Sequence, residues 1–199
     1  MPSLDFAPGT SWRYGDTGYY LLGMLIERLT GGPYEAALER LITRPLDMQA
    51  TEVLSYTALV PQRVDGYAHI NGAYRNAQRF DLDEFANGGI ISTLHDMVRF
   101  VTTFTGDAVL REEHRKRMRM PTRLEDGTVT KYGLGLGITP FNGRVGYGHT
   151  GGGGLGFATA FTPFPDDGVT VIVLANADQP EQTVGVLANT IASRFFRNP

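Results

Sequence analysis

The sequence of 199 residues contains no cysteine and only two lysines, Lys116 and Lys131. Without cysteine, the chain can form neither disulfides nor thiolate metal sites. The four histidines are scattered and show no paired spacing typical of a zinc site, so no metal or other cofactor is expected. The chain therefore offers only two candidates for a lysine that activates a nucleophile.

The charge and the hydrophobic runs exclude two further classes of protein. The formal net charge is -3, so the chain lacks the basic excess typical of proteins that bind nucleic acid. No apolar run approaches the roughly 20 residues of a membrane-spanning helix, and we therefore predict no membrane span. Hydrophobic residues still make up 42% of the chain, enough for a globular core.

Hydrophobic periodicity predicts helices early in the chain and strands later, which indicates the α+β class. We expect residues 1–131 to form a mainly helical part and residues 132–199 an antiparallel sheet covered by a C-terminal helix. The run VTVIVLA is almost continuously apolar and predicts a central strand. The predicted helices are 17–29, 33–42, 93–104, about 112–120 and one opening at Pro180, and the predicted strands are 132–139, 157–162 and 169–175.

The first stretch of interest is Tyr14-Gly15-Asp16, directly before the first predicted helix. In the simpler interpretation, Asp16 or Thr17 caps the helix by accepting hydrogen bonds from first-turn N–H groups, and Tyr14 only packs. In the catalytic interpretation, Tyr14 handles a proton. Because a tyrosine with a pKa near 10 is a poor base, the catalytic interpretation requires a cationic neighbour from elsewhere in the chain.

The second stretch is the glycine-rich segment GHTGGGGLGFATAFTP, which begins at Gly148. Glycines beside a strand let a ligand approach the backbone and its N–H groups closely. A flexible entry to a hairpin would use the same residues, so this local pattern leaves both interpretations open.

Five blocks occur together and in order: FAPGTSWRYGDTGYYLLGMLIERLTGG, RPLDM, ANGGIISTLHDMVRF, YGLGL and GHTGGGGLGFATAFTPFPDDGVTVIVLAN. In this order and spacing the chain resembles the serine β-lactamase-like hydrolases, which comprise class C β-lactamases, D,D-peptidases, D-aminopeptidases and esterases. The resemblance covers nearly the whole chain. It implies a β-lactamase/transpeptidase-like fold and an acyl-enzyme reaction on a small amide, ester or D-amino-acid peptide.

The resemblance also implies roles for six residues of this sequence. Tyr14 matches the tyrosine that exchanges a proton with the nucleophile and the leaving group, and Asp16 stands where asparagine is usual. His149-Thr150-Gly151 matches a Lys-Thr-Gly block, so His149 would be the cationic partner of Tyr14. This histidine is similar to that of D-aminopeptidase and esterase members and argues against an efficient β-lactamase. Thr150, Gly151 and Gly152 would bind the substrate, with the Gly152 N–H in an oxyanion hole.

The nucleophile of that family, the serine of a Ser-x-x-Lys motif, has no counterpart here. None of the five serines has a lysine three residues later, and Thr128-x-x-Lys131 has the spacing but lies out of order in a polar segment. We therefore expect the C-terminal part of a longer hydrolase, inactive by itself and missing an N-terminal segment. The exposed sheet edge left behind would favour a homodimer or aggregation. The alternative is a non-catalytic ligand-binding or interaction paralogue.

Overall fold

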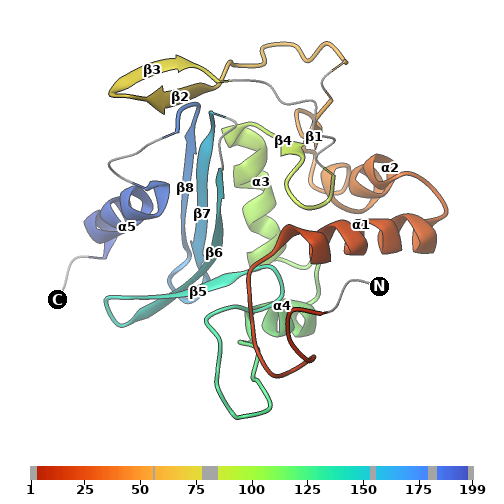
Figure 1. Ribbon diagram of the computed structural model, residues 1–199, viewed down its shortest axis with the longest axis vertical. Helices are drawn as coiled ribbons and strands as arrows, with labels where there is room; N and C mark the ends of the chain where they lie inside the picture. The colour runs from red at the N-terminus through yellow and green to blue at the C-terminus, as the bar shows by residue number, and fades with distance from the viewer. Residues whose placement is uncertain (1–3, 56, 78–84, 153–155, 179–182, 197–199) are drawn as a thin grey trace.

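The computed structural model describes residues 4–55, 57–77, 85–152, 156–178 and 183–196, and these form helices around an antiparallel sheet (Figure 1). The sheet has the strand order β5-β6-β7-β8, with every neighbouring pair antiparallel. Two small antiparallel sheets pair β1 with β4 and β2 with β3. This combination gives the α+β class that the sequence predicts.

The helical elements are α1 (Asp16–Thr30), α2 (Tyr34–Leu38), the π-helical turn η1 (Glu39–Thr43), α3 (Leu94–Thr105), α4 (Glu112–Arg119), the 3-10 turn η2 (Pro165–Asp167) and α5 (Val184–Phe195). The strands are β1 (Glu52–Val53), β2 (Tyr67–Ile70), β3 (Ala73–Asn76), β4 (Ile90–Ile91), β5 (Gly137–Phe141), β6 (Arg144–Gly152), β7 (Ala158–Phe164) and β8 (Val169–Ala175). None of the helices in the described ranges is long and apolar enough to cross a membrane.

Successive residues of a strand point to opposite faces of the sheet, and helices cover both faces. On one face, α5 packs on β7 and β8 to form the main core. Helix α3 lies on the other face (Figure 1). Its Phe100 and Phe104 rings lie 5.7 and 5.3 Å from the ring of Phe161 in β7. The core residues are Ala160, Phe164, Val171, Val173, Val184, Ala188, Ala192 and Phe196.

Helix α1 packs through one small area and exposes much of its apolar surface. Its buried Gly23 fits against Phe85, where an added Cβ would lie 2.4 Å from a ring carbon. Phe85 also contacts Tyr20 and Tyr34, so it joins α1 to α2. The remaining apolar residues form what we call the α1 apolar face. They are Leu21, Leu22, Met24, Leu25 and Leu29, each between 46% and 76% exposed.

The ends of the helices agree with the sequence in part. α1 ends at Gly31, which adopts a left-handed φ of 72° and donates its N–H to Glu27 O, as the Gly-Gly pair predicts. At its beginning the prediction is wrong, since the N-cap is Gly15 and no side chain caps the helix. The predicted helix 33–42 is divided between α2 and η1, with Pro33 as N-cap.

Thr93 caps α3, and its Oγ1 accepts a hydrogen bond from Asp96 N at 3.3 Å. Within the described residues, the Asp96 side chain does not return a hydrogen bond to the backbone of Thr93. The Asp96 carboxylate is buried and instead accepts hydrogen bonds from Ala50 N and Thr51 Oγ1, both at 2.8 Å. Asp96 therefore fastens the preceding loop to α3.

Two predictions about strands need correction. Residues 132–136 are not a strand, because Gly135 has a φ of 77° and turns the chain before β5 begins at Gly137. β8 is not central among the described strands, since only β7 pairs along its length. Its apolar run is instead explained by the packing of α5 against it. The segment around Pro180 lies outside the described residues, and α5 is described from Val184.

Candidate active site

Three rings from distant parts of the sequence meet beside the end of β6. The ring of Tyr14, just before α1, lies 5.6 Å from the ring of His149, measured between centroids. Tyr132, in the turn before β5, lies 6.3 Å from Tyr14 and 6.0 Å from His149. Trp12 packs on Tyr132 at 5.4 Å. We call these four residues the ring cluster.

Desolvation and nearby acidic groups keep the tyrosines of the cluster protonated. The pKa of Tyr14 is raised from its ordinary value, first by burial and then by the charges of Asp16 and Tyr19. Burial also raises the pKa of Tyr132, helped by a hydrogen bond with Tyr19 and by the charges of Tyr19 and Tyr14. Each is therefore a neutral phenol at ordinary pH, able to donate a hydrogen bond or a proton.

His149 has one nitrogen occupied by the backbone. Its Nδ1 lies 2.5 Å from the carbonyl oxygen of Thr150. Because a carbonyl oxygen can only accept, Nδ1 carries the proton in this contact, and Nε2 is the acceptor in the neutral ring. The ring can thus take up a proton at Nε2 and become the cation that the catalytic interpretation of Tyr14 requires.

Residues 149–152 of β6 pair with a strand on one side only. β7 pairs with them in the register His149↔Phe161 to Gly152↔Ala158, whereas the pairing with β5 ends at Gly148. Along the other edge, no described strand meets these residues. A short free strand edge therefore begins at the ring cluster and runs through Thr150 and Gly151 to Gly152.

Glycine is required along this strand for two reasons. At Gly148 an added Cβ would lie 1.9 Å from Phe161 O, so the two backbones meet more closely than any other residue allows. Gly152 has a φ of 146°, a conformation that side chains oppose. The three residues that follow Gly152 lie outside the described part of the chain.

Asp16 lies apart from the ring contacts. It is the first residue of α1, is exposed, and accepts no hydrogen bond from the described residues. Its effect on the site is electrostatic, because its negative charge disfavours ionisation of Tyr14. The catalytic interpretation of Tyr14 requires a cation beside it, whereas Asp16, which raises its pKa, is an anion.

Two of the described serines are engaged in hydrogen bonds away from the ring cluster. Ser92 hydrogen-bonds Thr51, and Ser193 donates to Thr190 O. Thr128 and Lys131 lie in the loop between α4 and β5, not on a helix that would align them. Across the described ranges, no group of three or more His, Asp or Glu residues could hold a metal ion.

The sequence motifs assign no role to Tyr132, Tyr19 or Trp12. Tyr132 is the first residue of the YGLGL block. That motif does not indicate that the Tyr132 ring contacts His149. Tyr132 is followed by the turn at Gly135, where the sequence predicted a strand. Tyr19 lies one turn into α1 and reads as part of an ordinary apolar stripe.

Comparison with known proteins gives a match along nearly the whole chain. The family model described as Beta-lactamase matches residues 2–194. Penicillin-binding protein 4* of Bacillus subtilis (strain 168) is 28% identical over 98% of this chain and 46% of its own length. A D-aminopeptidase of Gluconobacter oxydans (strain 621H) is 27% identical over 71% of this chain and 27% of its own length. The chain thus spans less than half the length of these relatives.

Solved structures show the same fold. The octameric penicillin-binding protein homologue from Pyrococcus abyssi superposes with a TM-score of 0.81 at 24% identity, covering 94% of this chain and 43% of that one. A D-stereospecific amidohydrolase from Streptomyces sp. gives a TM-score of 0.77 at 26% identity, covering 98% and 58%. The likeness therefore extends over the described chain and over only part of each neighbour.

Proposed function

Since the chain belongs to the Beta-lactamase family, we propose that it is the C-terminal portion of a serine hydrolase that forms an acyl-enzyme on a small amide, ester or D-amino-acid peptide. The observation that carries this proposal is the contact of Tyr14 with His149 at the start of a free strand edge. Such an edge accepts an extended substrate by main-chain hydrogen bonds and holds it against groups that transfer protons.

The proposed roles follow from the geometry and the charges. Tyr14, a neutral phenol, donates a proton to the leaving group, and His149 supplies positive charge when Nε2 is protonated. Thr150 and Gly151 bind the substrate backbone, and the N–H of Gly152 faces the developing oxyanion. For Tyr14 to act as a base as well, its pKa must fall, which requires a further cation near the ring.

We propose that the nucleophile and that cation belong to a segment outside this sequence. The support is the absence of a Ser-x-x-Lys motif together with the α1 apolar face. A soluble protein rarely leaves so many neighbouring leucines in water, so this face indicates that another segment packs there. By itself, the chain then contains the substrate-binding residues but no nucleophile.

Covalent labelling tests this proposal. A longer natural chain that includes upstream sequence should gain one fluorophosphonate adduct by intact mass, and residues 1–199 alone should gain none. Tyr14→Phe in the longer chain should slow labelling by about 10²- to 10⁴-fold. Tyr74→Phe, at an exposed tyrosine of β3, serves as the control. An adduct on residues 1–199 would contradict a nucleophile outside the sequence.

A non-catalytic binding module is the second candidate function. The observation that favours it is the raised pKa of Tyr14, which suits a hydrogen-bond donor better than a base. In that case the longer chain should bind D-amino-acid amides without hydrolysing them, and fluorophosphonate should label neither chain.

A further inference from the structure

A cavity lies between α4 and the end of β7. Its volume is about 560 Å³, within the range of roughly 300–1,000 Å³ typical of small-molecule sites. The end of α3, helix α4, strand β6 and the turn η2 contribute its walls. Tyr147 in this wall precedes His149 by two residues in β6, so both side chains point to the same face of the sheet.

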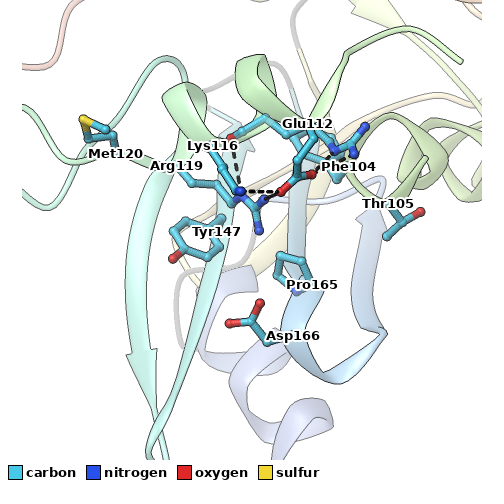
Figure 2. Close-up of a pocket in the computed structure, with 10 residues that line it drawn as sticks. Phe104, Thr105, Glu112, Lys116, Arg119, Met120, Tyr147, Pro165 and Asp166 are labelled. Carbon is cyan, nitrogen blue, oxygen red and sulfur yellow. Dashed lines mark hydrogen bonds and ion pairs between the residues drawn. The ribbon is translucent and has the colours of Figure 1, made fainter. Parts of the chain in front are cut away.

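One wall carries two cations, Lys116 and Arg119, whose terminal N–H groups form no hydrogen bond within the described residues. In Figure 2, Lys116 and Arg119 extend toward one oxygen of Glu112, at 3.5 and 3.8 Å, which are contacts longer than good hydrogen bonds. The other oxygen of Glu112 is bound by Arg115 at 2.7 Å. Arg115 is buried and also bonds Asp107, so it serves the structure and leaves Lys116 and Arg119 to share one oxygen.

Two contacts hold the side chain of Arg119 in position. Its Nε donates to Arg115 O at 3.3 Å, and its guanidinium lies 5.7 Å from the centre of the Tyr147 ring. These contacts fix the plane of the guanidinium and leave its terminal N–H groups for a ligand. A planar guanidinium beside an ammonium matches a carboxylate well.

The opposite side of the cavity carries a negative charge and apolar surface. Asp166 of η2 lies there with Pro165, and Phe104 and Tyr147 complete the apolar lining (Figure 2). Within the described residues, Asp166 forms no ion pair or side-chain hydrogen bond. The acids Asp166 and Glu112 oppose a polyanion, whereas a ligand with one carboxylate and one ammonium group satisfies both sides.

We propose that this cavity binds a zwitterionic amino acid or short peptide with an apolar side chain. Lys116 and Arg119 hold the carboxylate, Asp166 holds the ammonium group, and Phe104, Tyr147 and Pro165 contact the side chain. The site is separate from the ring cluster and does not rest on the function proposed above. It requires only residues 1–199.

Calorimetric titration of residues 1–199 with phenylalanine tests the site. Lys116→Met and Asp166→Asn should each weaken binding about tenfold, because each removes one charge-assisted contact. Both positions are exposed, so both variants should fold, as circular dichroism can verify. Arg117→Met is the matched control: it removes an exposed charge from the same helix but does not line the cavity, and it should leave binding unchanged.

Two further comparisons separate this cavity from the ring cluster and identify the ligand class. His149→Ala should leave phenylalanine binding unchanged, and loss of binding would assign the ligand to the ring cluster. N-acetylphenylalanine lacks the ammonium group and should bind about tenfold more weakly to the unaltered chain, but not to Asp166→Asn. Absence of phenylalanine binding, equal binding of both compounds, or an equal effect of Arg117→Met would overturn the proposal.

Discussion

Tyr132 is the central residue of the ring cluster, since its ring contacts Trp12, Tyr14 and His149. It shares a hydrogen bond with Tyr19 and is partly buried, and both raise its pKa. The same environment disfavours a phenolate on Tyr14. At the scale of single residues, Tyr14 and Tyr132 are therefore neutral phenols, and the proton transfer proposed for Tyr14 requires a positive charge from outside the ring cluster.

The raised pKa of Tyr132 predicts a loss of stability at alkaline pH. An unfolded tyrosine loses its proton near pH 10, whereas the folded protein retains that of Tyr132 to higher pH. The stabilisation is thus complete below about pH 10 and is lost as the pH rises through the raised pKa. Urea unfolding from about pH 8 to about pH 11 should show this decline, with a smaller decline in Tyr132→Phe.

Tyr74→Phe provides the comparison for this measurement because Tyr74 is 58% exposed in β3. Its alkaline decline should equal that of the unaltered protein. If Tyr132→Phe also declines like the unaltered protein, the buried phenol is not the cause. An ultraviolet titration of tyrosinate then shows whether Tyr132 ionises at its ordinary pKa.

At the scale of elements, strand β6 pairs with different strands in its two halves. Its first half, residues 144–148, pairs with β5, and its end at residues 149–152 pairs with β7. The close approach of Gly148 to Phe161 lies at the junction of the two halves. That contact brings β6 close to β7 where the pairing with β5 ends, directly before His149.

Gly148→Ala should destabilise the protein by about 1–3 kcal/mol or more, because its Cβ would overlap the Phe161 carbonyl and force the strands apart. Gly18→Ala is the paired control, since no atom lies within 4 Å of the added Cβ and the residue is helical. It should stabilise α1 by about 0.5–1 kcal/mol. Thermal unfolding measures both, and a Gly148→Ala variant as stable as the unaltered chain would contradict the close contact.

The elements that follow simple periodicity are predictable from the sequence, and those set by distant contacts are not. α1 and α3 have apolar residues at helical spacing, and their bounds agree with prediction within one or two residues. Residues 132–136 alternate like a strand, yet the positive φ of Gly135 makes them a turn. Apolar alternation cannot reveal that turn, because glycine permits both conformations.

The candidate site is predictable only in pieces. Tyr14 and His149 could be chosen by their resemblance to family motifs, whereas their contact and the place of Tyr132 depend on the folded chain. The side-chain cap expected from Asp16 or Thr17 is absent, and Asp16 acts through charge instead. Local sequence gives the residue types available at a helix end but not which of them the tertiary structure uses.

At the scale of the whole molecule, two surfaces remain available for contact with another chain. One is the α1 apolar face, and the other is the free edge of β8, which among the described residues has a partner strand only in β7. An unpaired edge that carries an apolar run tends to pair with another chain. Either surface can join two copies of this chain when no other segment covers it.

We predict that residues 1–199 associate in a concentration-dependent manner, measurable by analytical ultracentrifugation. Leu22→Lys with Leu29→Lys should reduce association if the α1 apolar face is responsible, because a buried lysine is unfavourable at an interface. Leu174→Lys should do so if the β8 edge is responsible. Leu59→Lys is the control, since Leu59 is 98% exposed. A clean monomer at all concentrations would contradict both surfaces.

The free edge at residues 149–152 of β6 offers main-chain groups, and main-chain groups are alike in every peptide. In the function proposed above, recognition along this edge is therefore independent of the ligand's side chains and depends on the spacing of its amides. Under the same proposal, discrimination between ligands falls to the rings of Trp12, Tyr14 and Tyr132 at the start of the edge. A new preference is accordingly expected from substitutions among those rings, while the strand beside them stays unaltered.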